Sequence, residues 1–248
     1  MTRQEAESPT AAGRVFATTH WSVVLAAREG QETQATAALE KLCRTYWYPL
    51  YAFLRRQGHS AEDAQDLTQG FFAHLLARDF LKGLSKENGR FRAFLLASLK
   101  NFLSDQWDKN RALKRGGGQK LLSLDEAAAS ERYQLEPADQ LSPDRIYERR
   151  WALTLLDQAM ARLREEFTAA GKADLFDVLR QFQGDELAAT TGVEAAARLG
   201  MPENTFKSHL HRFRQRYREL LCEEVAQTVA TPSEVEEELR HLKAVLAG

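Results

Sequence analysis

Cysteine, proline and long apolar runs are all scarce in this sequence. There are two cysteines and six prolines among 248 residues, and Cys43 and Cys222 belong to no CxxC pair. A disulfide framework or a zinc site needs more cysteines or a closer spacing, so we expect both to be buried thiols without a chemical role. No apolar run approaches the roughly 20 residues that span a bilayer, and the N-terminal MTRQEAESPT lacks the apolar segment of a signal peptide. We therefore expect a cytoplasmic protein.

The residue patterns of common catalytic and cofactor sites are also missing. The six histidines, at positions 20, 59, 74, 209, 211 and 241, form no HExxH or other metal-ligand spacing. The triple glycine at 116–118 lacks the GK[ST] ending of a phosphate-binding loop. No nucleophile elbow, paired-carboxylate motif or dinucleotide fingerprint is present. The sequence thus predicts a protein that is not an enzyme and that uses no metal or cofactor.

Net charge is nearly zero, but its distribution is strongly polarised. The total is -1, whereas residues 82–120 carry ten Lys/Arg against three Asp/Glu and residues 198–218 carry six against one. Each basic block is followed by an acidic one, since residues 121–144 carry one against six and residues 219–248 carry two against seven. Local positive charge of this kind marks the places where a polyanion such as nucleic acid would bind.

Helical periodicity dominates the chain, and β-branched runs are few, so we expect an all-α protein. A polar extension comes first, a long connection rich in acidic residues separates two small helical domains, and an acidic tail ends the chain. Pro49 should kink or break the first helix, while Ser60 and Asp63 form a capping box at the start of the second. The expected helices cover residues 34–56, from Ser60 onward, from Phe91 to the triple glycine, from Asp144 through Phe167, 173–182, 193–199, 203–229 and the tail.

The stretch from Val193 to Leu220 has the pattern of a helix-turn-helix motif. A short helix with small residues at 195–197 precedes Gly200, which supplies a tight turn, and Pro202 and Glu203 open a basic helix. This order is the geometry that places a second helix in the major groove of DNA. The bland alternative is a surface helix with solvated arginines, which the preceding turn makes less favourable.

At 100° per residue, the basic helix separates into distinct faces. The apolar residues fall on one stripe that should face the core, namely Phe206, Leu210, Phe213, Tyr217 and Leu221. Cations lie on both flanks, where they could reach phosphates, and outward polar residues in the N-terminal half could touch base edges. The candidate DNA contacts of this helix are Asn204, Thr205, Lys207, Ser208, His209, Arg212 and Arg216.

The first basic block differs because aromatic residues are interleaved with its charges. Aromatic faces and cations together are typical of proteins that hold single strands. Phe91, Phe94 and Phe102 lie at core spacing, which leaves Asn101, Trp107 and the cations of the block as plausible contacts. The candidates carried forward are Lys100, Asn101, Trp107, Lys109, Arg111, Lys114 and Arg115.

Together these segments resemble a bacterial RNA polymerase sigma factor of the extracytoplasmic-function (ECF) group, of the sigma-70 type. SAEDAQDLTQGFFAHLL and FRAFLLASLKNFLSDQWDKNRALKRGG are similar to region 2 of that family, and EAAARLGMPENTFKSHLHRFRQRYREL is similar to region 4. The resemblance implies five segments: an N-terminal extension (1–32), a region 2-like domain (33–115), a linker (116–143), a region 4-like helix-turn-helix domain (144–222) and an acidic tail (223–248).

The resemblance also implies partners, which are core RNA polymerase and promoter DNA, with an anti-sigma factor as a further possible partner. Asp63, Asp66 and Gln69 would face the clamp coiled coil of the largest polymerase subunit. Asn101 would help to form a pocket for a flipped base of the minus-10 element, and the other candidates of that block would line the melted strand. The candidates of the basic helix would contact the minus-35 element. Pro202 and Gly70 depart from the family pattern, as do both extensions.

Other readings stay open at this point. A stand-alone helix-turn-helix regulator would bind duplex DNA tightly without polymerase, whereas a sigma factor of this type should bind DNA poorly on its own. A helical interaction module without nucleic acid would be indifferent to charge reversal at Lys207 and Arg212. The acidic tail, following a basic helix, suggests the separate hypothesis that residues 223–248 fold over that helix and inhibit DNA binding.

Overall fold

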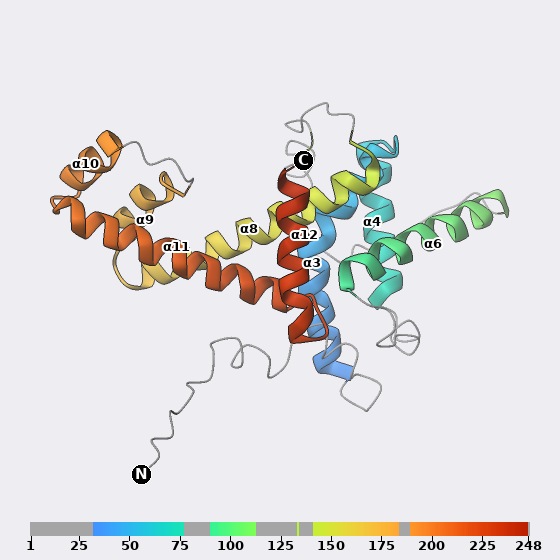
Figure 1. The fold of residues 1–248 in the computed structure, drawn as a ribbon. Helices are drawn as coiled ribbons and strands as arrows, with labels where there is room; N and C mark the ends of the chain where they lie inside the picture. The colour runs from blue at the N-terminus through green and yellow to red at the C-terminus, as the bar shows by residue number, and fades with distance from the viewer. Residues whose placement is uncertain (1–31, 77–89, 113–132, 134–140, 184–188, 248) are drawn as a thin grey trace, which may run out of the picture. The chain divides into compact units, whose positions relative to one another are not determined.

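The computed structural model describes residues 32–76, 90–112, 133, 141–183 and 189–247. These residues form eight helices, and no strand occurs among them (Figure 1). The predicted all-α fold is therefore confirmed. None of the described helices combines the length and the apolar character needed to cross a membrane.

The chain divides into two compact units. The first combines the described residues before Leu155 with residues 225–247, and the second spans Leu155–Glu224. The division falls within α8 (Pro143–Ala169) and within α11 (Glu203–Ala226), whereas the sequence pattern places the start of the second domain at residue 144. The predicted N-terminal extension lies outside the described residues except for its last residue.

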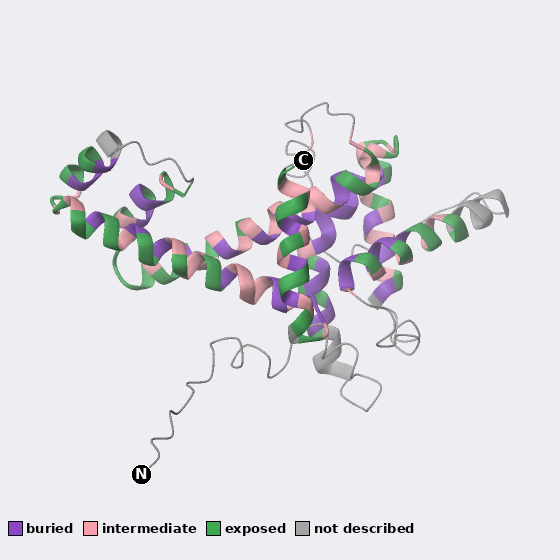
Figure 2. Ribbon diagram, viewed as in Figure 1, coloured by how far each residue is buried: buried purple, intermediate pink, exposed green. Residues whose placement is uncertain are grey.

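The first unit is organised around α3 (Glu32–Arg56), in which every residue from Tyr46 to Leu54 is buried (Figure 2). A helix can be buried on all sides only when other helices surround it. Tyr46 shows which ones do, because its ring lies 5.0 Å from that of Phe91 on α6 and 6.4 Å from that of Tyr147 on α8. The α4 helix packs along α3 as well.

Pro49 lies inside α3 without ending it. The sequence allowed either a kink or a break at this position, and the helix runs without a break on both sides of the proline. The missing backbone donor costs one hydrogen bond, but burial of the flanking aromatic and aliphatic side chains stabilises the helical turns around it. Gly58, with a φ of 98°, then lets the chain leave α3.

The start of α4 (Ala61–Leu76) follows the predicted capping box. The backbone N–H of Asp63 donates to the Ser60 hydroxyl oxygen over 3.0 Å, and that hydroxyl donates to the Asp63 carboxylate over 2.7 Å. Farther along, Phe71 and His74 each place their rings 5.7 Å from the ring of Phe102 on α6 (Phe91–Ala112). The second and third predicted helices therefore form and pack on each other.

The C-terminal segment is part of the first unit. After Ala226 the chain turns and forms α12 (Pro232–Ala247), which buries Val235, Glu238 and Leu242. The expected tail helix is thus present, but its ion pairs join it to Arg90, Arg92 and Glu148. The buried face of the tail helix therefore packs on the first unit, and the hypothesis that the tail also covers the basic helix stays a prediction.

Most of the predicted linker lies outside the described residues. Tyr133 is an exception, and its ring stands 6.3 Å from the ring of Tyr51 and 4.7 Å from the guanidinium carbon of Arg55. Because Tyr51 and Arg55 belong to α3, this part of the connection packs on the first unit.

The second unit encloses a phenylalanine-rich core. Phe167 and Phe176 lie 5.8 Å and 5.7 Å from Phe213, and Phe182 lies 5.4 Å from Phe206. These rings come from the end of α8, from α9 (Ala173–Arg180) and the turn after it, and from α11. Small residues of α10 (Ala189–Arg198), Ala195 and Ala196, close the same core. The core fixes α11 with one face inward.

Candidate nucleic-acid and polymerase interfaces

The helix-turn-helix motif is present in the second unit as α10, a turn at Gly200 and α11. Gly200 has a φ of 63°, which L side chains rarely adopt, and its N–H donates to the carbonyl of Ala197 over 3.0 Å. The N–H of Met201 donates to the carbonyl of Ala196 over 3.0 Å, which ends α10. The carbonyl of Pro202 accepts from the N–H of Phe206, so the helical hydrogen bonds of α11 begin at once. The glycine turn predicted from the sequence is confirmed.

The inward face of α11 is the predicted apolar stripe. Phe206, Leu210 and Phe213 are buried, and Tyr217 and Leu221 are half-buried against the same core. The Tyr217 hydroxyl donates to the carbonyl of Leu156 over 3.3 Å, which ties the middle of α11 to α8. With this stripe inward, the opposite side of the helix must face outward.

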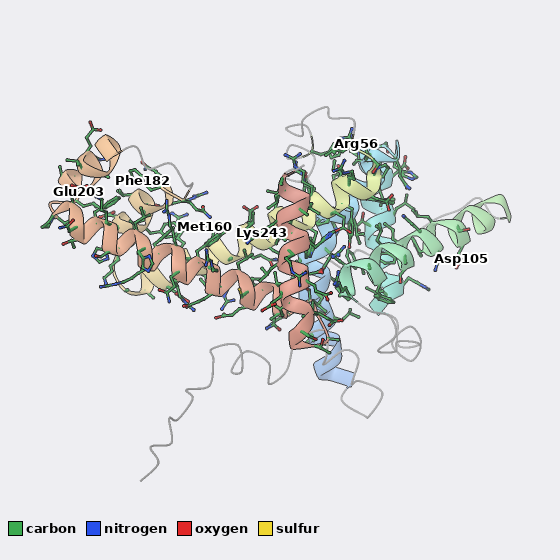
Figure 3. All side chains as sticks on the ribbon, viewed as in Figure 1. Arg56, Asp105, Met160, Phe182, Glu203 and Lys243 are labelled. Atoms are coloured by element: carbon green, nitrogen blue, oxygen red, sulfur yellow. The ribbon has the colours of Figure 1, made fainter. Side chains whose placement is uncertain are left out.

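The outward face of α11 carries most of the predicted DNA contacts. Glu203 marks the N-terminal end of this helix in Figure 3. Among the predicted contacts along the first three turns, Asn204, Thr205, Lys207, Ser208 and Arg212 are exposed, and His209 is half-buried. The Ser208 hydroxyl donates to the Asn204 carbonyl over 2.9 Å, and Lys207 pairs with Glu203 over 2.6 Å. Both interactions are exposed and weak, so a ligand could replace them.

Arg216, the last predicted contact on this helix, is bound by three carboxylates instead. Its guanidinium donates to both oxygens of Glu166 over 2.7 Å and 2.9 Å, and it also pairs with Glu219 over 3.0 Å and Glu223 over 3.5 Å. The hydrogen bonds to Glu166 raise the pKa of Arg216 above its ordinary value. Bidentate hydrogen bonds of this kind fix the guanidinium in one orientation.

Arg214 is also occupied within the unit. Its guanidinium donates to the carbonyl of Phe182 over 2.9 Å, next to the ring that packs on Phe206. The two arginines of α11 that follow Phe213 at positions 214 and 216 therefore fasten the helix to its own unit. On α11, the exposed lysine and arginines that could meet phosphate are Lys207, Arg212 and Arg218.

The candidate polymerase-binding residues lie on α4. Asp63 and Asp66 are exposed and Gln69 is half-buried, and their spacing of three residues keeps them on one side of the helix. The Asp63 carboxylate accepts from the Ser60 hydroxyl, so part of its hydrogen-bonding capacity serves the helix start. Gly70, next to Gln69, lies where a Cβ would stand 3.6 Å from the Phe102 ring, which is an ordinary contact distance.

The candidates of the first basic block lie on α6. Lys100 and Asn101 are exposed, and the Lys100 ammonium pairs with the Asp144 carboxylate over 2.5 Å at the start of α8. Farther along the helix, Asp105 in Figure 3 is also exposed. Trp107, Lys109 and Arg111 belong to the helix, but their side chains lie outside the described part, as do Lys114 and Arg115 altogether.

Comparison with known families identifies the family of this chain. Residues 26–222 match the family model described as ECF sigma factor. The chain belongs to the ECF sigma factor family. Members of this family associate with RNA polymerase and direct promoter-specific initiation of transcription, which is not an enzymatic activity of the sigma factor itself. No curated protein and no solved structure matches the chain significantly.

The ECF match ends before α12, although this helix contributes to the first unit. Glu238 on α12 is buried and accepts from the Arg92 guanidinium over 2.5 Å, and Arg92 also donates to Glu148 over 2.6 Å. Burial by itself would lower the pKa of Arg92, but the hydrogen bond to Glu238 and the charge of Glu148 outweigh it and raise that pKa. Arg92 is therefore a buried cation in this ECF sigma factor.

This cluster corrects one interpretation of the first basic block. All of its cations were plausible nucleic-acid contacts, but Arg90 pairs with Glu237 and Glu238, and Arg92 is occupied by Glu238 and Glu148. These ion pairs were not predicted from the sequence, because only the net negative charge of the tail was considered. Val235, Glu238 and Leu242 are spaced by three and four residues, so they lie on one buried side of the helix. The same spacing of Val235 and Leu242 in the sequence could have indicated that this helix has a buried face.

Proposed function

We propose that this ECF sigma factor recognises the minus-10 element with α6 and the minus-35 element with α11, and that it binds core polymerase through α4. The observation that carries the proposal is the α10–Gly200–α11 motif, in which a phenylalanine core fixes α11 and leaves its N-terminal half exposed and polar. A helix presented in this way can enter a major groove.

On α11 we assign base contacts to the exposed polar residues of the first turns, Asn204, Thr205 and Ser208. Short side chains with both donor and acceptor capacity suit base edges. Lys207, His209 and Arg212 flank them and would neutralise phosphates, which favours binding through counterion release. We assign Arg216 a structural role, because a phosphate would have to displace Glu166 from a bidentate ion pair.

On α6 we assign the minus-10 contacts to Asn101 and Lys100, followed by Trp107, Lys109, Arg111, Lys114 and Arg115. The pair between Lys100 and Asp144 supports this assignment, since its side chains are 47% and 54% exposed. Exposed pairs contribute about 0–1 kcal/mol, so a promoter phosphate could take the place of Asp144. Asn101 would hold an unstacked base beside it.

On α4 we assign the polymerase contact to Asp63, Asp66 and Gln69, which would face the clamp coiled coil of the largest subunit. Exposed carboxylates on one side of a short helix suit a partner surface with basic residues. An anti-sigma factor that covers α4 or α11 would compete for the same faces.

The test is reconstitution with core polymerase. We expect the chain to bind core polymerase and to produce promoter-dependent transcripts, and we expect Lys207→Glu with Arg212→Glu to reduce those transcripts without loss of core binding. The matched control is Arg164→Glu with Arg180→Glu, which makes the same charge change at exposed positions of the same unit. Asp66→Lys should weaken core binding instead.

Two results would contradict the proposal. Failure of the wild-type chain to bind core polymerase, or equal transcription from the Lys207/Arg212 variant and its control, would remove its basis. Tight duplex binding by the chain without polymerase would favour a stand-alone helix-turn-helix regulator.

A further inference from the structure

The first turn of α6 is held by the C-terminal segment. Three consecutive residues are involved: Arg90 pairs with Glu237, the N–H of Phe91 donates to the carbonyl of Thr228 over 3.4 Å, and the Arg92 guanidinium donates to Glu238. All of these partners lie beyond residue 222, where the ECF match ends. A segment outside the family pattern therefore anchors the helix that the family uses at the promoter.

The anchor is built from directional, buried contacts. The side chain of Glu238 is 1% exposed and that of Arg92 is 8% exposed, and the guanidinium carbon of Arg92 lies 5.2 Å from the centre of the Trp151 ring. A charge-assisted hydrogen bond in such a place depends steeply on geometry. Loss of Glu238 would leave the buried Arg92 with Glu148 as its one remaining carboxylate partner among the described residues. The pair therefore tolerates little displacement of α6 relative to α12.

The start of α8 closes this arrangement. The Tyr147 hydroxyl donates to the backbone carbonyl of Arg92 over 2.9 Å, and Glu148 accepts from Arg92 over 2.6 Å. The other oxygen of Glu148 lies 2.8 Å from Nε2 of His241 on α12. The first turn of α6 is thus bound from two helices, which are also bound to each other.

The anchor lies on the same continuous helix as Lys100 and Asn101, so its geometry affects their positions. Asn101 follows Arg92 by nine residues, which at 1.5 Å per residue is about 13 Å along the helix axis. The helix is continuous between them, so a tilt at its first turn displaces Lys100 and Asn101 by a proportionate amount.

We propose that α12 is a positioning element for promoter opening, and that Glu238 is its positioning residue. By holding Arg92, Glu238 fixes α6 in the orientation in which Lys100 and Asn101 receive the unpaired strand. This inference rests on the proposed minus-10 role of α6. Core binding through α4 and minus-35 binding through α11 do not depend on it.

The test compares promoter opening with promoter binding in the reconstituted holoenzyme. We expect Glu238→Gln, which removes the charge and keeps the shape, to slow opening of a duplex promoter about tenfold, as the loss of a charged hydrogen bond would. On a template whose minus-10 region is already unpaired, the defect should be clearly smaller than on the duplex, because the strand then needs only to be held and no longer to be opened. Core binding and duplex binding before opening should be unchanged.

The matched control is Glu236→Gln, an identical change two residues earlier on the exposed side of α12. It should open the duplex promoter at the wild-type rate. The conservative variant Glu238→Asp retains the charge but shortens the side chain by one methylene, so it should recover part of the lost rate.

A folded Glu238→Gln protein that opens the duplex promoter at the wild-type rate would overturn the inference. Equal defects on the duplex and the pre-opened template would overturn it as well, because they would indicate general loss of structure. If Glu238→Gln does not fold, Arg92→Lys takes its place: it keeps the cation but cannot reach both carboxylates in the same way. We expect Arg92→Lys to slow opening of the duplex promoter in the same way. A wild-type opening rate of this variant would overturn the inference. Failure of the wild-type chain to open any promoter would instead contradict the proposed function.

Discussion

Arg92 and Glu238 are 146 residues apart in the chain, yet the Nε of Arg92 donates to Oε1 of Glu238 over 2.5 Å in a site closed to solvent. A buried ion pair therefore joins α6 to the C-terminal helix α12 within the first unit. Because charges in such a place are costly unless both partners are present, this pair makes specific predictions about stability.

Replacement of Arg92 by an apolar residue should be strongly destabilising. Arg92→Met would leave the buried Glu238 with Arg90 as its remaining cation and would also remove the partner of Glu148, and we expect the free energy of unfolding to fall by about 3–5 kcal/mol. Urea denaturation of the full chain measures it. Lys100→Met removes the exposed pair with Asp144 and serves as the control, with an expected change of about 0–1 kcal/mol. Similar losses in both variants would contradict the buried pair.

The C-terminal helix should behave as core and not as a surface tail. Leu242 is buried, so we expect Leu242→Ala to lower the free energy of unfolding by about 2–4 kcal/mol through lost burial and a cavity. Lys243→Ala, at the next and exposed position, should change it by less than about 0.5 kcal/mol. Thermal and urea unfolding test the pair, and equal behaviour of the two variants would show that α12 does not pack as described.

Substitutions of two arginines of α11 should have different effects, one on DNA binding and the other on stability. Arg212 is exposed, whereas Arg216 is bound to Glu166, Glu219 and Glu223. We expect Arg212→Ala to reduce the slope of log affinity against log salt by about 1 without a change in melting temperature. Arg216→Ala should lower the melting temperature and leave that slope unaltered. The measurement is a salt titration of holoenzyme on promoter DNA, and the reversed assignment would be the contrary result.

The ion pair of Arg216 with Glu166 predicts a dependence on pH. The hydrogen bond from Arg216 lowers the pKa of Glu166 below its ordinary value. The unfolded chain therefore takes up the proton first, so this stabilisation is complete above about pH 4.3 and is lost as the pH falls through the lower folded pKa. Glu166 is 43% exposed, so the effect should stay below about 1 kcal/mol.

Urea unfolding of wild type and Glu166→Gln, followed from neutral pH down to about pH 3, tests this sign. The two stabilities should differ at neutral pH and converge in acid. Parallel curves over the whole range would show that the pair contributes nothing measurable.

Gly70 should tolerate alanine. The added Cβ would meet the Phe102 ring at 3.6 Å, which is ordinary contact, and alanine is the better helix former. We expect Gly70→Ala to raise the free energy of unfolding by about 0.5–1 kcal/mol. Urea denaturation measures the change, and a loss of stability would mean that α4 and α6 approach each other more closely than described.

Much of the local structure could be predicted because it depends on neighbours within one or two helical turns. The capping box at Ser60 and Asp63, the turn at Gly200 and the inward stripe of Phe206, Leu210 and Phe213 are all of this kind. Short-range propensity and periodicity contain the necessary information. The break allowed at Pro49 did not occur, because burial of the surrounding helix is a property of the whole first unit.

The sequence by itself determined that the chain is helical, where α4 and α11 begin, which face of α11 turns inward, and the resemblance that led to the ECF family. The start of α10 differed, since it lies at Ala189 and not at the predicted Val193. Only the tertiary structure decided which cations remain available to a partner. In sequence Arg92 and Arg216 look no different from Lys207 and Arg212, but Arg92 is bound by a carboxylate 146 residues away and Arg216 by one 50 residues away. Periodicity describes the direction in which a side chain leaves its helix. Whether a cation on that side chain is already paired depends on which carboxylates folding brings close to it.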